Sequence, residues 1–95
     1  IVAPYVGKVT GLTLTASGKK IINKWSKVSG ATGYEVYRKA KGESYIKVKT
    51  VTDGTSYTTV TLSADKYYVK VRAYKKIGST KFYGSFSDVK SIIVK

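Results

Sequence analysis

Alternation of apolar and polar residues dominates the chain and predicts a fold built from short β-strands. The clearest case is residues 67–74, where Tyr67, Val69, Val71 and Ala73 share one side and the residues between them share the other. A period of two residues is typical of a half-buried strand. The same pattern predicts strands over residues 12–16, 20–25, 34–39, 45–51 and 56–60.

The last predicted strand, over residues 82–94, has an irregular pattern. We expect Val89, Ile92 and Val94 to face inward, and because their spacing changes parity we place a β-bulge near Ser91. Turn-forming residues such as Asp53-Gly54 separate the other strands. Since no segment keeps a helical apolar period, the pattern predicts an antiparallel β-sandwich or barrel of about seven strands.

The length fits one domain with one core. Residues 1–8, interrupted by Pro4 and Gly7, are predicted to be a lead-in or linker, and residues 9–95 the domain. The chain starts at Ile1 rather than Met, so we expect a domain of a longer protein or a mature fragment. It has no apolar stretch of the roughly 20 residues that span a bilayer.

A Gly-x-x-Gly quartet, Gly30-Ala31-Thr32-Gly33, stands before a basic, aromatic run. Such a quartet between two helices clamps a nucleic-acid backbone in KH domains. Here both flanking segments are predicted strands, so we interpret the quartet as a turn in which glycines supply unusual backbone angles.

Three stretches of the chain together form a specific pattern. They are Trp25 followed by Val28-Ser29-Gly30-Ala31-Thr32-Gly33-Tyr34-Glu35-Val36-Tyr37-Arg38, then Thr55-Ser56-Tyr57-Thr58, then Leu62 with Tyr67, Val69, Val71 and Ala73. This pattern resembles the fibronectin type III domains of secreted, multidomain proteins of Gram-positive bacteria. The resemblance covers roughly residues 9–94 and implies a seven-stranded, immunoglobulin-like antiparallel β-sandwich.

The resemblance also implies structural roles. Trp25 would lie in the core between two sheets, and Tyr67 would be the "tyrosine corner", packed near Leu62 with its hydroxyl bonded to the connecting backbone. The opposing sheet would fill the core with Tyr34, Val36, Val69 and Val71.

Two features depart from the family pattern. The gap between Leu62 and Tyr67 is one residue shorter than is usual in the family, so we expect an altered corner geometry. Asn23 stands where an aliphatic residue usually faces inward. Either the strand shifts, Ile22 takes the inward place, or Asn23 finds a backbone partner, because an unpartnered buried amide would cost about 1–3 kcal/mol.

The net charge of +13, from 18 basic and five acidic residues, attracts polyanions without choosing among them. The basic residues are spread along the chain, and we expect most of them to solvate outward strand positions and protect sheet edges. There are no cysteines, so neither a disulfide nor a thiolate metal site is available.

Catalysis has little support. The chain contains no His and no Cys, and its five carboxylates are scattered, with Glu35 expected to point outward among lysines. A glycosidase needs two carboxylates across one cleft, and a calcium site needs several oxygens together. We therefore expect a protein that is not an enzyme, with no cofactor and no bound metal.

One surface suggests binding: the outward side of the strands over residues 34–39 and 67–76. Tyrosines interleaved with cations suit sugar stacking, cation–π contacts or single-stranded nucleic acid, although such residues also form ordinary solvated sheet faces. The candidate binding residues are Tyr37, Tyr68, Lys70, Arg72 and Tyr74, with Lys39 and Lys76 on the same side.

The sequence thus favours a non-catalytic, extracellular spacer or interaction module of a larger bacterial surface or secreted protein. Its expected partners are the neighbouring domains, and we expect a monomer. The alternative is a module that binds carbohydrate or an anionic cell-wall polymer through the tyrosine- and lysine-rich face. A third hypothesis, charge-driven binding of nucleic acid without sequence preference, follows from the net charge alone.

Overall fold

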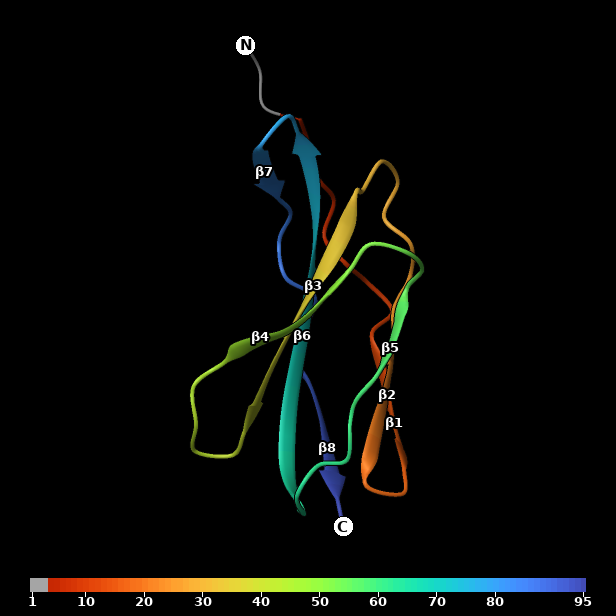
Figure 1. Cartoon of the computed structure of the whole chain (residues 1–95), viewed down its shortest axis with the longest axis vertical. Helices are drawn as coiled ribbons and strands as arrows, with labels where there is room; N and C mark the ends of the chain where they lie inside the picture. The colour runs from red at the N-terminus through yellow and green to blue at the C-terminus, as the bar shows by residue number, and fades with distance from the viewer. Residues whose placement is uncertain (1–3) are drawn as a thin grey trace.

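A computed structural model describes residues 4–95 as two antiparallel β-sheets packed into a sandwich (Figure 1). The predicted all-β sandwich is therefore confirmed. The described residues contain no helix long and apolar enough to cross a membrane. Residues 1–3 of the predicted lead-in lie outside the described residues. The strands are β1 (Thr13–Ser17), β2 (Lys20–Lys24), β3 (Gly33–Ala40), β4 (Ile46–Val51), β5 (Ser56–Thr58), β6 (Asp65–Ile77), β7 (Thr80–Tyr83) and β8 (Lys90–Val94).

The smaller sheet has the order β1-β2-β5, and the larger one has the order β4-β3-β6-β7. The 13-residue strand β6 organises the larger sheet, because β7 pairs with its C-terminal half and β8 with its N-terminal half. On its other side, β6 pairs with all eight residues of β3. The outward faces of β3 and β6 therefore form one continuous surface.

Eight strands appear instead of seven because the last predicted strand is two strands. Tyr83 pairs with Tyr74 and Lys90 with Val69, so residues 84–89 span only residues 70–73 of β6. This 84–89 arc keeps two bonds to β6, since the amides of Gly84 and Ser87 donate to Ala73 O and Val71 O at 2.9 and 2.7 Å. The extra residues are accommodated in this arc.

The predicted bulge near Ser91 is wrong. The pairing of β8 with β6 runs without a break from Lys90 to Val94, and Val89 is 50% exposed rather than inward. Val94 is buried, as expected. The irregularity therefore lies several residues earlier, in the 84–89 arc.

The core lies between the sheets and is built from the alternating apolar positions. Trp25 contributes from the end of β2, and its ring centroid lies 5.4 Å from that of Tyr34 on β3. The Tyr34 hydroxyl also accepts a hydrogen bond from the amide of Val28 at 2.9 Å, which fixes the chain before the turn. The other members of this core include Val9, Leu12, Val36, Val51, Val69, Val71 and Ala73.

A second cluster closes the opposite end of the sandwich. Tyr67 packs there with Ile21, Leu62 and Val94. The Tyr67 hydroxyl donates a hydrogen bond of 2.7 Å to the carbonyl of Ser63, four residues earlier. The short connection between Leu62 and Tyr67 therefore still allows the hydroxyl to reach the connecting backbone.

Asn23 faces inward and is fully buried, and of the three sequence alternatives it follows the one with a backbone partner. Its Nδ2 donates to Tyr57 O at 2.9 Å and to Ile21 O at 3.3 Å. The amide thus replaces hydrophobic packing by a polar link between β2 and β5. Its Oδ1 has no hydrogen-bond partner among the described residues.

The Gly-x-x-Gly quartet forms the turn between β2 and β3. A glycine is required at its first position for the backbone conformation and at its last position for space. Gly30 has a φ of +77°, the left-handed region that glycine adopts easily. Gly33 has no positive φ; instead, a Cβ there would lie 2.7 Å from the Tyr74 hydroxyl and 2.8 Å from Val51 O. Gly33 therefore leaves room for the Tyr74 ring on the outward side of the sheet.

We predict that Gly33→Ala lowers the free energy of unfolding by about 1–3 kcal/mol, because the added methyl group forces Tyr74 and the backbone of β4 apart. Urea denaturation measures this change. Gly7→Ala is the matched control and should be nearly neutral, since its Cβ would meet only ordinary contacts at 3.5 Å or more. Equal effects of the two substitutions would contradict the account of Gly33.

Candidate functional site

The candidate binding residues all belong to the outward side of the larger sheet, here called the outer face. The register sets Tyr37 on β3 opposite Lys70 on β6, with Lys39 opposite Tyr68 and Gly33 opposite Tyr74. The alternation of the two strands thus gathers the candidate residues on one surface. Their surroundings, however, divide this surface into two parts.

The first part is centred on Glu35. Glu35 points outward from β3 among lysines, as predicted, but it is buried there, with only 1% of it exposed. Its Oε1 accepts a hydrogen bond from Arg72 Nε at 3.0 Å, and its Oε2 lies 3.2 Å from Lys81 Nζ and 3.7 Å from Lys47 Nζ. We call Glu35, Tyr37, Lys47, Arg72 and Lys81 the Glu35 cluster.

The Glu35 cluster ties together four strands of the larger sheet. Its members come from β3, β4, β6 and β7. Tyr37 completes it, since its hydroxyl lies 3.4 Å from Glu35 Oε1 and accepts from Arg72 Nη2 at 3.1 Å. One carboxylate therefore faces three cations, and the residual charge of this part is positive.

The charge state of Glu35 follows from two opposing effects on its pKa. Burial raises the pKa of the carboxyl, but the hydrogen bonds from Arg72 and Lys81 and the nearby positive charges outweigh it, so the pKa lies below its ordinary value. The hydrogen bond to Glu35 likewise raises the pKa of Lys81. Both groups are therefore charged at neutral pH.

Aromatic rings enclose the Arg72 guanidinium. Its Cζ lies 3.7 Å from the ring centroid of Tyr83, 5.0 Å from that of Phe86 and 5.3 Å from that of Tyr37. Tyr37 and Phe86 meet edge to face, with centroids 5.2 Å apart. The edge of the guanidinium donates a hydrogen bond to Glu35, and aromatic rings pack around it. Arg72 therefore has few groups left to contact a ligand.

Tyr74, a candidate for ligand contact, is only 3% exposed. The Nζ of Lys81 lies 4.3 Å from its ring centroid, and the ring of Tyr83 flanks it at 6.5 Å. Tyr74 therefore lies on the outer face, as predicted, but its ring is covered and offers little surface to a ligand. The signal that could have revealed this cover is the Tyr-Gly pairing across β3 and β6, because a ring opposite a glycine lies down on the sheet.

The second part of the outer face holds Lys39, Lys66, Lys70, Tyr45 and Tyr68, which we call the lysine–tyrosine cluster. Lys39 Nζ lies 5.3 Å from the Tyr45 centroid and 5.2 Å from the Tyr68 centroid. Lys70 approaches Tyr45 at 4.4 Å, and Lys66 approaches Tyr68 at 5.4 Å. Within residues 4–95, none of these lysines forms an ion pair with a carboxylate.

The sequence-based candidates contained only Tyr68 and Lys70 of this cluster. Tyr45 was missed although the predicted strand over residues 45–51 included it, because the candidate surface was drawn only from the strands over residues 34–39 and 67–76; in the structure Tyr45 directly precedes β4. Its half-burial raises the pKa of its hydroxyl, and the neighbouring Tyr68 adds to the shift. Lys66 lies on the outer face because β6 begins two residues earlier than predicted, at Asp65.

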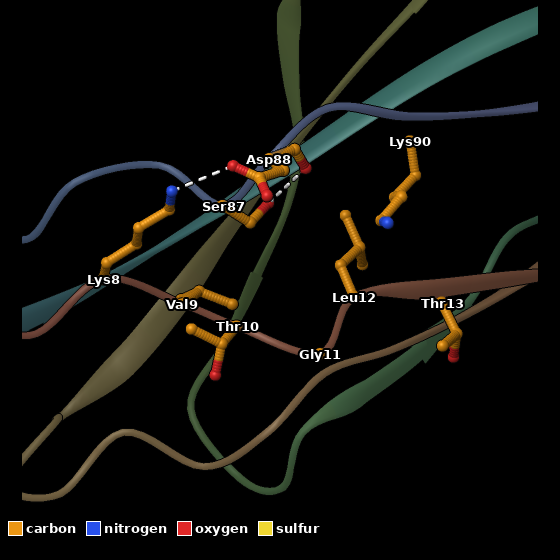
Figure 2. A pocket seen from close by; sticks show the side chains of 9 residues that line it. All are labelled: Lys8, Val9, Thr10, Gly11, Leu12, Thr13, Ser87, Asp88 and Lys90. Carbon is orange, nitrogen blue, oxygen red and sulfur yellow. Dashed lines mark hydrogen bonds and ion pairs between the residues drawn. The ribbon is translucent and has the colours of Figure 1, made fainter.

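Two hollows lie beside the sheets, and Lys39 of the outer face lines the second of them. One, of about 350 Å³, lies between residues 8–13 and 87–90, and the Lys8–Asp88 ion pair of 2.9 Å spans it (Figure 2). The hydrogen bond from Lys8, helped by the charges of Lys8 and Lys90, lowers the pKa of Asp88. None of the candidate binding residues lines this hollow.

A second hollow, of about 420 Å³, lies between residues 38–46 and 61–67. Two carboxylates, Glu43 and Asp65, line it. Asp65 is occupied by its own backbone, since its Oδ1 accepts from the amide of Lys66 at 2.7 Å. Among residues 4–95 no three ligating side chains gather as a metal site would require.

Comparison with solved structures identifies the class of fold. A Fn3-like protein from Clostridium thermocellum is 26% identical, with a TM-score of 0.64, and the match covers 99% of this chain and 94% of that one. A fibronectin type III domain of human collagen XX is 20% identical, with a TM-score of 0.72 and coverage of 99% and 100%. No family model and no curated protein matches the chain.

The chain is thus a fibronectin type III-like domain. The chicken CNTN1 FN1-FN3 structure, 21% identical with a TM-score of 0.75, is matched over 97% of this chain but only 31% of its own length. Such domains are commonly modules of multidomain or extracellular proteins, and their fold is typically non-catalytic. At these identities the likeness to the animal proteins concerns the fold.

We predict that Glu35→Gln lowers the free energy of unfolding by about 2–4 kcal/mol, because three cations then remain together without their anion. Chemical denaturation at neutral pH measures the change. Glu43→Gln, an exposed carboxylate without an ion pair among residues 4–95, is the matched control and should change stability by less than about 0.5 kcal/mol. Equal stability of Glu35→Gln and the parent would contradict the role of the cluster.

The lowered pKa of Glu35 also predicts a pH dependence. The contribution of Glu35 is fully present above the pKa of an unfolded glutamate, about 4.3, and is lost as the pH falls through the lower pKa of the folded state. The stability difference between the parent and Glu35→Gln should therefore shrink below about pH 4. Denaturation curves between about pH 7 and pH 2 test this, and a difference independent of pH would contradict it.

Proposed function

We propose that the domain is a non-catalytic spacer and interaction module of a larger, extracellular bacterial surface or secreted protein. The observation that carries the proposal is the position of its two ends. Val6 and Gly7 lie beside Gly84, the residue after β7, because a Cβ on Gly84 would contact Gly7 O and Val6 O. Lys95 lies at the other end, where its carbonyl accepts from Lys19 at 3.0 Å (Figure 1).

The dimensions support this proposal. The domain measures 48 × 24 × 21 Å, so a chain that enters beside β7 and leaves after β8 advances along the long axis. Neighbouring domains on the two ends would be held apart by the length of a sandwich with a packed core. The bacterial Fn3-like neighbour, 26% identical, supports the bacterial setting.

The second candidate function is binding of carbohydrate or an anionic cell-wall polymer through the outer face. The lysine–tyrosine cluster favours it, because half-exposed tyrosines and unpaired cations lie together there. The Glu35 cluster does not support it, since its cations are already occupied. The candidate ligand contacts thus shift from Tyr37, Arg72 and Tyr74 toward Tyr68 and Lys70.

A distance measurement tests the spacer function. Cysteines introduced by Tyr5→Cys and Lys95→Cys can be labelled selectively, because the chain has no other cysteine. The two dyes should report one narrow distance distribution near the 48 Å long axis. The same pair in denaturant is the control and should give a broad distribution. A broad distribution in the native protein, or a separation near its 24 Å width, would refute the spacer function.

A further inference from the structure

We propose that the lysine–tyrosine cluster is a binding site for the sulfate or phosphate esters of an anionic glycan. This inference rests on the polymer-binding function proposed above and gives it a place and a ligand class. The site comprises Lys39, Lys66 and Lys70 with the rings of Tyr45 and Tyr68.

The two parts of the outer face differ in how their cations are satisfied. In the Glu35 cluster, Arg72 and Lys81 both donate hydrogen bonds to one buried carboxylate. In the lysine–tyrosine cluster, no side-chain hydrogen bond from the three lysines to residues 4–95 accompanies the ring contacts. An incoming anion would therefore find in the second part three ammonium groups that no carboxylate of residues 4–95 already holds.

The rings hold the three ammonium groups close to one another. Lys39 and Lys66 share the Tyr68 ring, and Lys39 and Lys70 share the Tyr45 ring. The Nζ of Lys39 therefore lies within about 11 Å of the Lys66 Nζ and within about 10 Å of the Lys70 Nζ, comparable with the Debye length of about 10 Å at 0.1 M salt. An anion among these ammonium groups relieves their repulsion and gains charge-assisted hydrogen bonds.

The chemistry of the cations selects the type of anion. The cluster contains lysines only, and a lysine acts as a compact point charge rather than as the planar fork with which arginine recognises a carboxylate. A tetrahedral sulfate or phosphate ester can accept from several such charges at once. The half-buried lysine stems also hold the charges near fixed positions on the strands.

The rings favour a glycan over a nucleic acid as the carrier of these esters. Each tyrosine ring already has two ammonium groups within 5.4 Å of its centroid. Rings occupied in this way are poorly available for stacking with bases, on which single-strand binding depends. Their hydroxyl edges remain suited to hydrogen bonds with the hydroxyl groups of sugars.

The test is a titration of the domain with dextran sulfate and phosphorylated dextran, with neutral dextran and a DNA oligomer as comparisons, at physiological salt. The triple variant Lys39→Gln, Lys66→Gln, Lys70→Gln should bind at least one charged dextran about tenfold more weakly than the parent. The matched control is the triple variant Lys20→Gln, Lys24→Gln, Lys27→Gln, which has the same net charge and changes exposed lysines outside the cluster. It should bind within about threefold of the parent.

The outcomes separate the possibilities. Equal weakening by the two triple variants would overturn the site and leave only net charge. If DNA binds as tightly as the charged dextrans and the cluster variant weakens both equally, the proposed preference for a glycan over a nucleic acid is overturned. If neutral dextran binds as well as the charged forms, the anion site is overturned but a carbohydrate-binding module remains. If no polymer binds, both the anion site and the polymer-binding function are overturned.

Thermal melting verifies that each variant folds. If the triple variant unfolds, Lys66→Gln alone replaces it.

Discussion

The burial of one carboxylate, Glu35, on the outward side of a sheet organises the larger half of this domain. A charge in that position is stable only where its partners are fixed, because desolvation must be offset by several hydrogen bonds. Arg72 comes from the paired position on β6, Lys81 from β7 and Lys47 from β4. The ionic contacts of Glu35 thus join all four strands in the order β4-β3-β6-β7.

The same arrangement accounts for the side chains that β7 and the 84–89 arc, both hydrogen-bonded to β6, place over the outer face. Tyr83 on β7 and Phe86 in the arc bring their rings to the Arg72 guanidinium, and Ser87 in the arc turns inward. The Ser87 Oγ accepts from the amide of Val71 at 3.0 Å, so a side chain replaces the ladder bond that a regular strand would have provided. The interruption of the last strand therefore supplies the cover of the Glu35 cluster.

The sequence predicted the strands and most of the inward residues because both depend on a period of two, which is visible locally. It also assigned Tyr37, Tyr68 and Arg72 to one face for the same reason. The sequence did not predict the burial of Glu35 and Tyr74 on that face. Their burial depends on Lys81 and Tyr83, which lie on β7. Alternation specifies the side of a sheet on which a residue lies, but the cover on that side depends on pairing between distant segments.

A net charge of +13 could explain the binding of polyanions without any defined site. The positions of the cations, however, distinguish those held by Glu35 from those gathered in the lysine–tyrosine cluster. Of the chain's five acidic residues, Glu35 is the one buried beneath the outer face, and it accounts for the cations around it. Lys39, Lys66 and Lys70 lie beyond its reach yet are gathered over two rings, which costs repulsion that dispersed lysines would avoid. A solvated face has no need to gather its charges in this way, whereas a site for a multiply charged polymer does. Under the two functions proposed above, the same sandwich would separate its neighbours along its length and present one anion-binding surface along its side.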